Sequence, residues 1–203
     1  MHIEFLIEEA SAEIVLTEIV PKILGDGITF KVHDFRGKSN LIKKLPDRMK
    51  GYKNMLKYQN DWRIVVLIDE DRQDCQELKK KLEEISAESG LSTPSTSVNF
   101  QVLNRIAVEE LEAWFFGDIE ALTEAYPKVP KTLTKRKNYR NPDEIRGGTW
   151  EALDRVLSSA GYYTKGFMPK TEVARTIAPF MNPELNSSKS FQVFRDGLKS
   201  FLN

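Results

Sequence analysis

The chain has 203 residues, 40% of them hydrophobic and 10% aromatic, which is enough for one well-buried core with an extension. Its 30 Lys and Arg side chains balance its 30 Asp and Glu side chains, so no global field steers it onto nucleic acid or an anionic membrane. The single Cys75 excludes an internal disulfide, and no apolar stretch approaches the roughly 18 residues of a membrane span. Because the start of the chain also lacks the features of a signal peptide, we expect a cytoplasmic protein.

Four strand patterns, each followed by a helix pattern, predict an α/β fold. We expect strands over residues 3–7, 28–33, 62–68 and 98–103, and helices over residues 11–24, 39–58, from Asp71 or Asp74 to Gly90, and over residues 108–116. Pro46 and Gly51 predict a break or kink near Leu45 in the second helix. The strand at 62–68 is nearly continuous in β-branched residues, which is typical of burial on both faces of a parallel sheet. We therefore predict a four-stranded parallel sheet flanked by helices.

The composition changes beyond Pro127. Basic residues alternate with Pro and Gly as far as Arg146, which predicts a basic, loop-rich segment. Three helix patterns follow, over residues 150–158, 170–180 and 190–202. We expect an α/β domain over residues 1–118, with a basic loop and helical extension packed on it over residues 119–203.

Acidic residues stand directly after two of the predicted strands. Glu8 follows the first strand, and Asp69 and Asp71 follow the third. If these strands are neighbours, in the order two-one-three-four, the acids converge at the carboxyl edge, where open α/β sheets bind ligands. Helix capping would explain one such group, but capping needs a single carboxylate, whereas Mg²⁺ or Mn²⁺ needs several oxygens. Two groups therefore favour a cation site.

Further acids lie near the same predicted edge. Glu9 and Glu13 follow the first strand, and Asp74 follows the third. A solvated helix acid is the more common interpretation for Glu13. Glu109 and Glu112 follow the fourth strand, and the residues alone leave open whether they start a helix or ligate a cation.

The principal motifs resemble those of Toprim domains. FLIE at residues 5–8 and LIDED at residues 67–71 look like the paired acidic motifs of topoisomerases, DnaG-type primases and OLD-family nucleases. The resemblance covers roughly residues 3–114. The acid in EAW at residues 112–114 is similar to one that recurs in the Toprim-like domain of unknown function (DUF) family 4276, often encoded beside ABC-type ATPases.

This resemblance implies divalent-metal phosphoryl transfer, with Mg²⁺ or Mn²⁺ as the cofactor. The metal ligands that it carries over are Glu8, Asp69, Asp71 and, as an additional acid of the OLD-like subgroup, Glu112. OLD-like nucleases also use a lysine downstream of the acidic motifs, and Lys170, after Pro169, is the candidate here.

Two functions of different classes are compatible with these residues. The first is a metal-dependent nuclease acting on DNA or RNA, as effector of an ATPase-linked phage-defence system; that setting rests on the resemblance alone. The second is a non-catalytic, cation-binding regulatory subunit that docks an ABC-type ATPase. Family members usually have Gly where this chain has Glu9, so Glu9 either joins the metal site or marks a site that has drifted.

The basic segment is the local patch that a neutral chain needs in order to hold nucleic acid. Its candidate phosphate contacts are Lys131, Lys135, Arg136, Lys137 and Arg140. Tyr139 would then stack on a base. A solvated surface loop fits the composition equally well.

Overall fold

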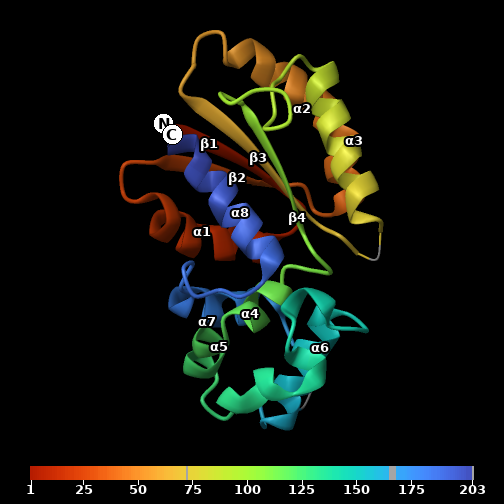
Figure 1. Ribbon diagram of the computed structural model, residues 1–203, viewed down its shortest axis with the longest axis vertical. Helices are drawn as coiled ribbons and strands as arrows, with labels where there is room; N and C mark the ends of the chain where they lie inside the picture. Colours follow the sequence, from red (N-terminus) through yellow and green to blue (C-terminus); the bar gives the residue numbers. More distant parts are fainter. Residues whose placement is uncertain (72, 165–167, 203) are drawn as a thin grey trace.

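A parallel sheet of four strands lies at the centre of the molecule, a computed structural model that describes residues 1–71, 73–164 and 168–202 (Figure 1). The strands are β1 (His2–Ile7), β2 (Thr29–Asp34), β3 (Trp62–Asp69) and β4 (Val102–Ala107). They lie in the order β2-β1-β3-β4, and every neighbouring pair is parallel. This confirms the predicted α/β fold and places the carboxyl ends of β1 and β3 next to each other, where the strand order reverses.

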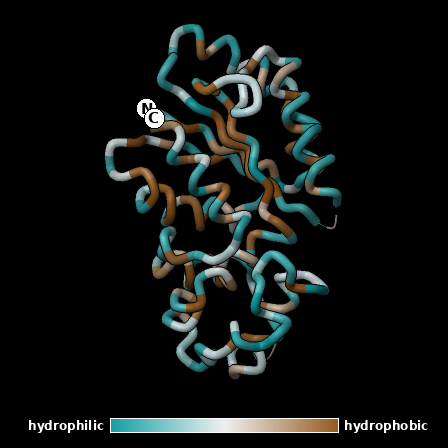
Figure 2. The backbone as a smooth tube through the Cα atoms, in the orientation of Figure 1, coloured by the Kyte–Doolittle hydropathy of each residue, from teal (hydrophilic) through white to brown (hydrophobic). Residues whose placement is uncertain are grey.

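Helices cover both faces of the sheet. They are α1 (Ala10–Leu24), α2 (Lys38–Met55), α3 (Cys75–Glu88) and α8 (Lys189–Lys199). Because side chains alternate along a strand, Leu6 packs toward α2 and α3, while Phe5 packs toward α1 and α8. Both faces of the central strands are therefore buried, and Figure 2 shows hydrophobic residues concentrated along them.

The remaining helices form an extension at the carboxyl edge of the sheet (Figure 1). They are α4 (Ala113–Gly117), α5 (Ile119–Ala125), α6 (Thr149–Ser159) and α7 (Lys170–Ile177), with short 3-10 turns η1 (Lys131–Lys135), η2 (Lys137–Tyr139), η3 (Pro142–Glu144) and η4 (Ala178–Phe180). The last 3-10 turn, η5 (Ser200–Leu202), follows α8 and lies at the opposite edge, where Phe201 packs on Phe100 just before β4. One hydrophobic cluster includes Phe5 of β1, Trp114 of α4 and Phe191 of α8, so the extension shares its core with the sheet. No helix in the described residues is long and apolar enough to cross a membrane.

The fourth strand lies later in the chain than its pattern predicted. Val98, Phe100 and Val102 alternate with polar residues, but Val98 is 94% exposed and the strand begins only at Val102. Asn104 and Arg105 interrupt the apolar run of the true strand and made it hard to recognise. Their side chains form hydrogen bonds to α3 and α8.

Two helix predictions were also wrong in detail. The helix expected over residues 108–116 begins only at Ala113, because Glu109 has the left-handed backbone conformation (φ 60°) that interrupts a helix. Of the break or kink expected near Leu45, the break does not occur, because α2 continues through Pro46. The apolar stripe that α2 buries against the sheet stabilises this helix despite the missing hydrogen bond.

Glu83 joins α3 to β4 and makes the stability of the protein depend on pH. Burial alone would raise the pKa of this carboxyl, but hydrogen bonds from Lys79, Thr93 and Asn104 outweigh burial and lower the pKa from 4.5 to about 2. A lowered folded-state pKa stabilises the protein above the unfolded-state pKa, and the effect is lost as the pH falls toward the folded-state pKa.

We expect Glu83→Gln to lower the free energy of unfolding by about 2 kcal/mol at pH 7, and by less than half of that at pH 3. Urea denaturation at the two pH values measures both. Glu84→Gln is the matched control, because Glu84 is 58% exposed and its ion pair with Lys80 spans 3.8 Å. If the free energy of unfolding falls by the same amount at both pH values, Glu83 does not have the lowered pKa described above.

Candidate functional site

Three carboxylates are buried at the carboxyl edge of the sheet. Glu8 comes directly after β1, Asp69 ends β3, and Glu112 stands at the N-cap position of α4. Their exposed fractions are 9%, 7% and 1%, which is unusual for acids. The structure thus brings together acids predicted from three separate stretches of the chain.

Glu8 and Asp69 are in direct contact. The amide N–H of Asp69 donates to Glu8 Oε1 at 2.5 Å. Burial raises the pKa of Glu8, and the nearby charges of Asp71 and Glu9 act in the same direction. The pKa of Asp69 is raised well above its ordinary value, first by burial and then by the charges of Glu8 and Glu112. The negative charge at this point is therefore not fully balanced by its protein surroundings.

Lys170 is the nearest positive charge. Its Nζ lies 3.3 Å from Glu9 Oε1 and 3.5 Å from Glu112 Oε1. The Trp150 ring lies beside it, with the ring centre 5.5 Å from Nζ. Burial opposes the charge on Lys170, but Glu112, Glu9 and Asp69 outweigh burial and raise its pKa. We call Glu8, Glu9, Asp69, Glu112 and the contacting Lys170 the carboxylate cluster.

One carboxylate oxygen of Glu112 has no hydrogen-bond partner among the described residues. Oε1 contacts Lys170, whereas Oε2 is buried and accepts no hydrogen bond from the described residues. Burial raises the pKa of Glu112 to about 7, although Lys170 opposes the increase. A buried polar atom without a partner is costly, so this oxygen marks a place that a cation or a polar substrate group would complete.

The chemistry of these side chains fits a hard divalent cation. Mg²⁺ and Mn²⁺ prefer carboxylate oxygens, and the cluster sets four carboxylates against one ammonium group. Glu8, Asp69 and Glu112 would hold such an ion. Among the described residues, no three His, Cys, Asp or Glu side chains already have the arrangement of a metal site. A cation could therefore be held here only if side chains of the cluster moved.

Asp71, the second acid of the Asp-x-Asp motif, has different surroundings. Its side chain is 50% exposed, and its Oδ2 lies 2.9 Å from Nζ of Lys38. Lys38 also donates to the backbone carbonyl of Glu70 at 3.1 Å. The structure therefore keeps Asp71 near Glu8 but pairs it with a lysine from the start of α2. Sequence reasoning missed Lys38, whose one signal was its position soon after the second strand.

Backbone strain is concentrated in the loops of this edge. Arg36, Asp71 and Glu109 follow β2, β3 and β4, and they have φ values of 57°, 50° and 60°. Non-glycine residues rarely adopt positive φ, which costs about 1–3 kcal/mol each. Hydrogen bonds join the loops after β3 and β4: the Asp71 N–H donates to the Glu109 carbonyl at 3.1 Å, and the Glu109 N–H donates to Glu70 Oε2 at 2.9 Å. Strain of this kind is common at functional sites.

The loop after β4 also positions the extension. Gly148, the N-cap of α6, has no side chain that could cap the helix, and Glu110 Oε2 accepts the Trp150 N–H at 2.8 Å instead. This cap places the Trp150 ring beside Lys170. Glu109 lies outside the cluster and lines an acidic hollow of about 210 Å³. The other lining residues are Asp71, Glu110, Gly148 and Glu151.

Two of the additional candidate acids also lie outside the carboxylate cluster. Glu13 is exposed on α1, and its carboxylate forms no hydrogen bond or ion pair within the described chain. Asp74 caps α3, because its Oδ1 accepts the N–H groups of Gln76 at 2.8 Å and Glu77 at 3.0 Å.

We expect Asp74→Ala to lower the free energy of unfolding by about 1 kcal/mol, because two N–H groups of α3 lose their acceptor. Asp74→Asn keeps an acceptor oxygen and serves as the control in thermal denaturation. An equal loss in both variants would show that capping is not the role of this side chain.

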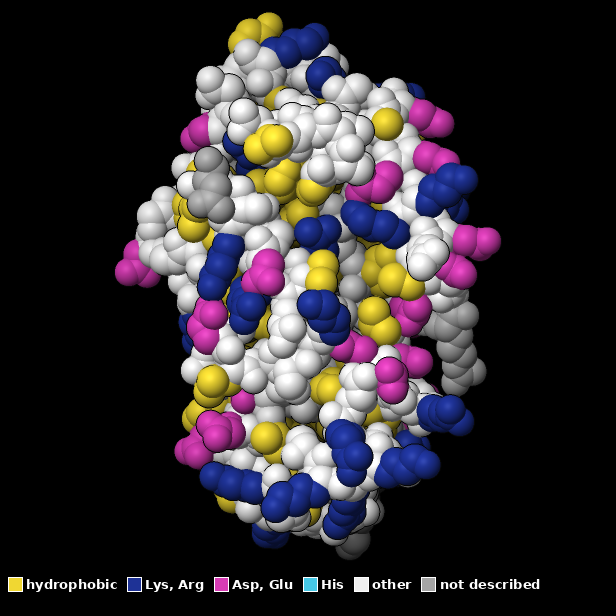
Figure 3. All heavy atoms as spheres, viewed as in Figure 1, with side chains coloured by type: hydrophobic (Ala, Val, Ile, Leu, Met, Phe, Trp, Pro, Cys, Tyr) yellow, Lys and Arg dark blue, Asp and Glu magenta, His cyan; other side chains and the backbone are white. Residues whose placement is uncertain are grey.

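The predicted nucleic-acid contacts lie on the surface of the extension. All five are exposed, and none forms an ion pair within the described chain: Lys131, Lys135, Arg136, Lys137 and Arg140. Figure 3 shows Lys and Arg side chains gathered over this end of the molecule. Arg146 and Arg155 line a hollow of about 470 Å³ together with Lys137 and Tyr139. The Tyr139 ring is stacked on Phe116 with centroids 5.5 Å apart, so one face of the ring is covered and cannot stack on a base.

Comparison with known proteins places the chain in a family. No curated protein and no solved structure matches it. The family described as Domain of unknown function (DUF4276) matches residues 7–199, a span that contains every residue of the carboxylate cluster. The chain therefore belongs to the DUF4276 family.

Proposed function

We propose that the protein is a divalent-metal-dependent nuclease that hydrolyses phosphodiester bonds of DNA or RNA. The observation that carries the proposal is the meeting of Glu8, Asp69 and Glu112 at one edge of the sheet, with one Glu112 oxygen buried and without a donor among the described residues. Carboxylates gathered in this way favour a hard cation, and Mg²⁺ and Mn²⁺ are the usual cations of phosphoryl transfer.

A Toprim-like, OLD-like relationship is part of the same proposal. The strand order and the positions of Glu8 and Asp69 at the ends of β1 and β3 support it. Lys170 supports it further. The resemblance is the only ground on which the sequence predicts this lysine, which is far from the acidic motifs along the chain and nevertheless contacts the cluster.

Each residue has a role that follows from its surroundings. Glu8, Asp69 and Glu112 hold the cation, which when bound polarises a phosphoryl oxygen and activates water. Lys170 keeps a positive charge beside the reacting phosphate, because its acidic neighbours hold it in the charged form. Trp150 is a positioning residue that keeps this lysine in place.

The basic surface of the extension holds the nucleic acid. Its cations have no carboxylate partners within the described chain, so they are available to phosphate groups. Each phosphate contact adds about 0.9 to the slope of log affinity against log salt for duplex DNA. Removal of Lys137 and Arg140 should therefore weaken binding and reduce that slope.

The test is cleavage of plasmid and single-stranded substrates in Mg²⁺ or Mn²⁺. We expect the wild type to cut and the double variant Asp69→Ala/Asp71→Ala to be inactive, with EDTA abolishing cleavage. Glu13→Gln is the matched control, since it removes an acid close to Glu8 in sequence that lies outside the cluster. Equal activity of the wild type and the double variant, with the partner ATPase supplied, would refute the proposal.

A second candidate is a non-catalytic regulatory subunit of an ABC-type ATPase. The observation that favours it is the ion pairing of Lys170 with both Glu9 and Glu112, because a fixed ammonium group can neutralise the cluster without a metal. Stable co-purification with such an ATPase, and no cation-dependent cleavage, would support this candidate over the first.

A further inference from the structure

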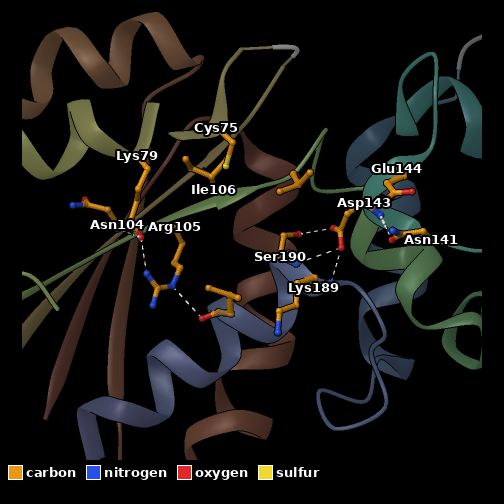
Figure 4. A pocket seen from close by; sticks show the side chains of 12 residues that line it. Cys75, Lys79, Asn104, Arg105, Ile106, Asn141, Asp143, Glu144, Lys189 and Ser190 are labelled. Carbon is orange, nitrogen blue, oxygen red and sulfur yellow. Dashed lines mark hydrogen bonds between the residues drawn. The ribbon is translucent and has the colours of Figure 1, made fainter. Parts of the chain in front are cut away.

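A further cavity, separate from the two hollows described above, lies at the open edge of β4, away from the carboxylate cluster (Figure 4). It has a volume of about 550 Å³ and is enclosed by α3 and β4 on one side and by η3 and α8 on the other. No residue of the carboxylate cluster lines it. A cavity of this size, at the junction of two parts of a chain, is typical of small-molecule sites.

Much of the cavity wall is apolar. Ile106 belongs to β4, Val108 follows that strand, and Val193 comes from α8. Val193 is 42% exposed, so an apolar side chain of a packed helix remains open to the cavity. The thiol of Cys75 completes this wall, and Figure 4 shows it beside Ile106. The wall would bury a ring or a short hydrocarbon body.

Two cations converge at one end of the cavity. Lys79 Nζ and Arg105 Nη1 both donate to the backbone carbonyl of Asn104, at 3.0 and 2.9 Å. Arg105 Nε donates to the Val193 carbonyl at 3.1 Å, and within the described chain Arg105 has no carboxylate partner. Burial lowers the pKa of Lys79, and the charge of Arg105 contributes to the decrease. This repulsion would be relieved by an anion between the two groups.

The acids of the lining do not supply that anion. Asp143 is occupied by the start of α8, where Oδ1 accepts the hydroxyl of Ser190 at 2.9 Å and Oδ2 accepts the Lys189 N–H at 2.5 Å. Glu144 is exposed on the opposite wall. Glu83 forms an ion pair with Lys79 and none with Arg105, although its charge opposes the effect of burial on the pKa of Arg105. One carboxylate, Glu83, thus stands against two cations, and Arg105 keeps no direct ion pair within the described chain.

We propose that this cavity binds a small amphiphilic anion. Its apolar body lies against Ile106, Val108 and Val193, and its single carboxylate, sulfonate or phosphate group lies between Lys79 and Arg105. The site is independent of nuclease activity, so it can be tested by binding alone.

The probe is 8-anilinonaphthalene-1-sulfonate, an aromatic sulfonate whose fluorescence rises in an apolar site. We expect saturable binding at one site per chain and, with Lys79→Gln or Arg105→Gln, an affinity lower by about tenfold, because a charge-assisted hydrogen bond is lost. Gln retains a donor for the Asn104 carbonyl, which limits damage to the fold. Lys80→Gln is the matched control on α3, since Lys80 is 77% exposed and lies outside the cavity.

Cys75 provides a second measurement that does not depend on those variants. It is the one cysteine of the chain, so alkylation by neutral iodoacetamide reports on this cavity alone. Bound sulfonate should slow the alkylation. The proposal fails if N-phenyl-1-naphthylamine, the uncharged analogue, binds as tightly as the sulfonate, if Lys80→Gln weakens binding as much as Lys79→Gln, or if saturating probe leaves the alkylation rate unchanged.

Discussion

Asp69→Asn should stabilise the protein while abolishing the metal-dependent cleavage that we propose. The folded protein holds Asp69 buried beside Glu8 and Glu112, and its raised pKa means that the ionised form opposes folding. A neutral amide removes this repulsion and can donate to the neighbouring carboxylates. We expect the free energy of unfolding to rise by about 1–2 kcal/mol at pH 8 without divalent metal. Urea denaturation in EDTA measures the gain.

The pH and metal dependence of this gain follow from the same pKa. A raised folded-state pKa favours the folded state at low pH, so the advantage of Asn should shrink as the pH falls and Asp69 becomes protonated. Mg²⁺ or Mn²⁺ should raise the melting temperature of the wild type but not of Asp69→Asn. Asp71→Asn is the matched control, with an expected change below about 0.5 kcal/mol, because Asp71 is half-exposed. A destabilised Asp69→Asn protein would contradict the charge argument.

Trp114→Ala should destabilise the protein strongly. The side chain of Trp114 is fully buried, its ring packs on Phe191 and Phe194 with centroids 5.1 and 5.0 Å away, and its Nε1 donates to Ser190 Oγ at 3.0 Å. Truncation leaves a cavity between α4 and α8 and lowers the free energy of unfolding by about 3–5 kcal/mol. Chemical denaturation followed by circular dichroism measures the loss.

Trp114→Phe separates packing from hydrogen bonding. Phenylalanine keeps an aromatic ring in contact with Phe191 and Phe194, while Ser190 Oγ still donates to Asp143 at 2.9 Å. We expect a loss of about 1–2 kcal/mol, well below that of the alanine variant. If the two variants lose the same amount, ring packing is not what holds α4 to α8.

The central strands could be predicted because burial on both faces requires long apolar runs. This requirement made β3 easy to recognise, and the turn residues around it set its ends. The edge strand β4 was harder, because Asn104 and Arg105 are polar residues whose partners come from distant helices. Local pattern cannot show such partners. The alternation of Val98 and Phe100 then suggested a strand where the chain forms a loop.

In the candidate site, too, local pattern predicts the positions of residues but not their distant partners. Glu8 and Asp69 could be found because they stand where strands end, and strand order alone brings those ends together. The surroundings of Asp71 could not be predicted, since Lys38 reaches it only through tertiary packing of α2. Glu110 lies in the acidic stretch after the fourth strand, but its role as the cap of α6 could not be predicted, because it depends on Gly148, far along the chain.

The cap that Glu110 provides has a consequence for how the molecule can be divided. A fragment starting after residue 118 would contain α6 without its acceptor and α8 without the indole that fills its apolar face. Such a fragment should remain largely unfolded in isolation, and the intact chain should melt in one cooperative transition. We therefore expect the carboxyl-terminal part of the chain to depend on the amino-terminal part for its folding.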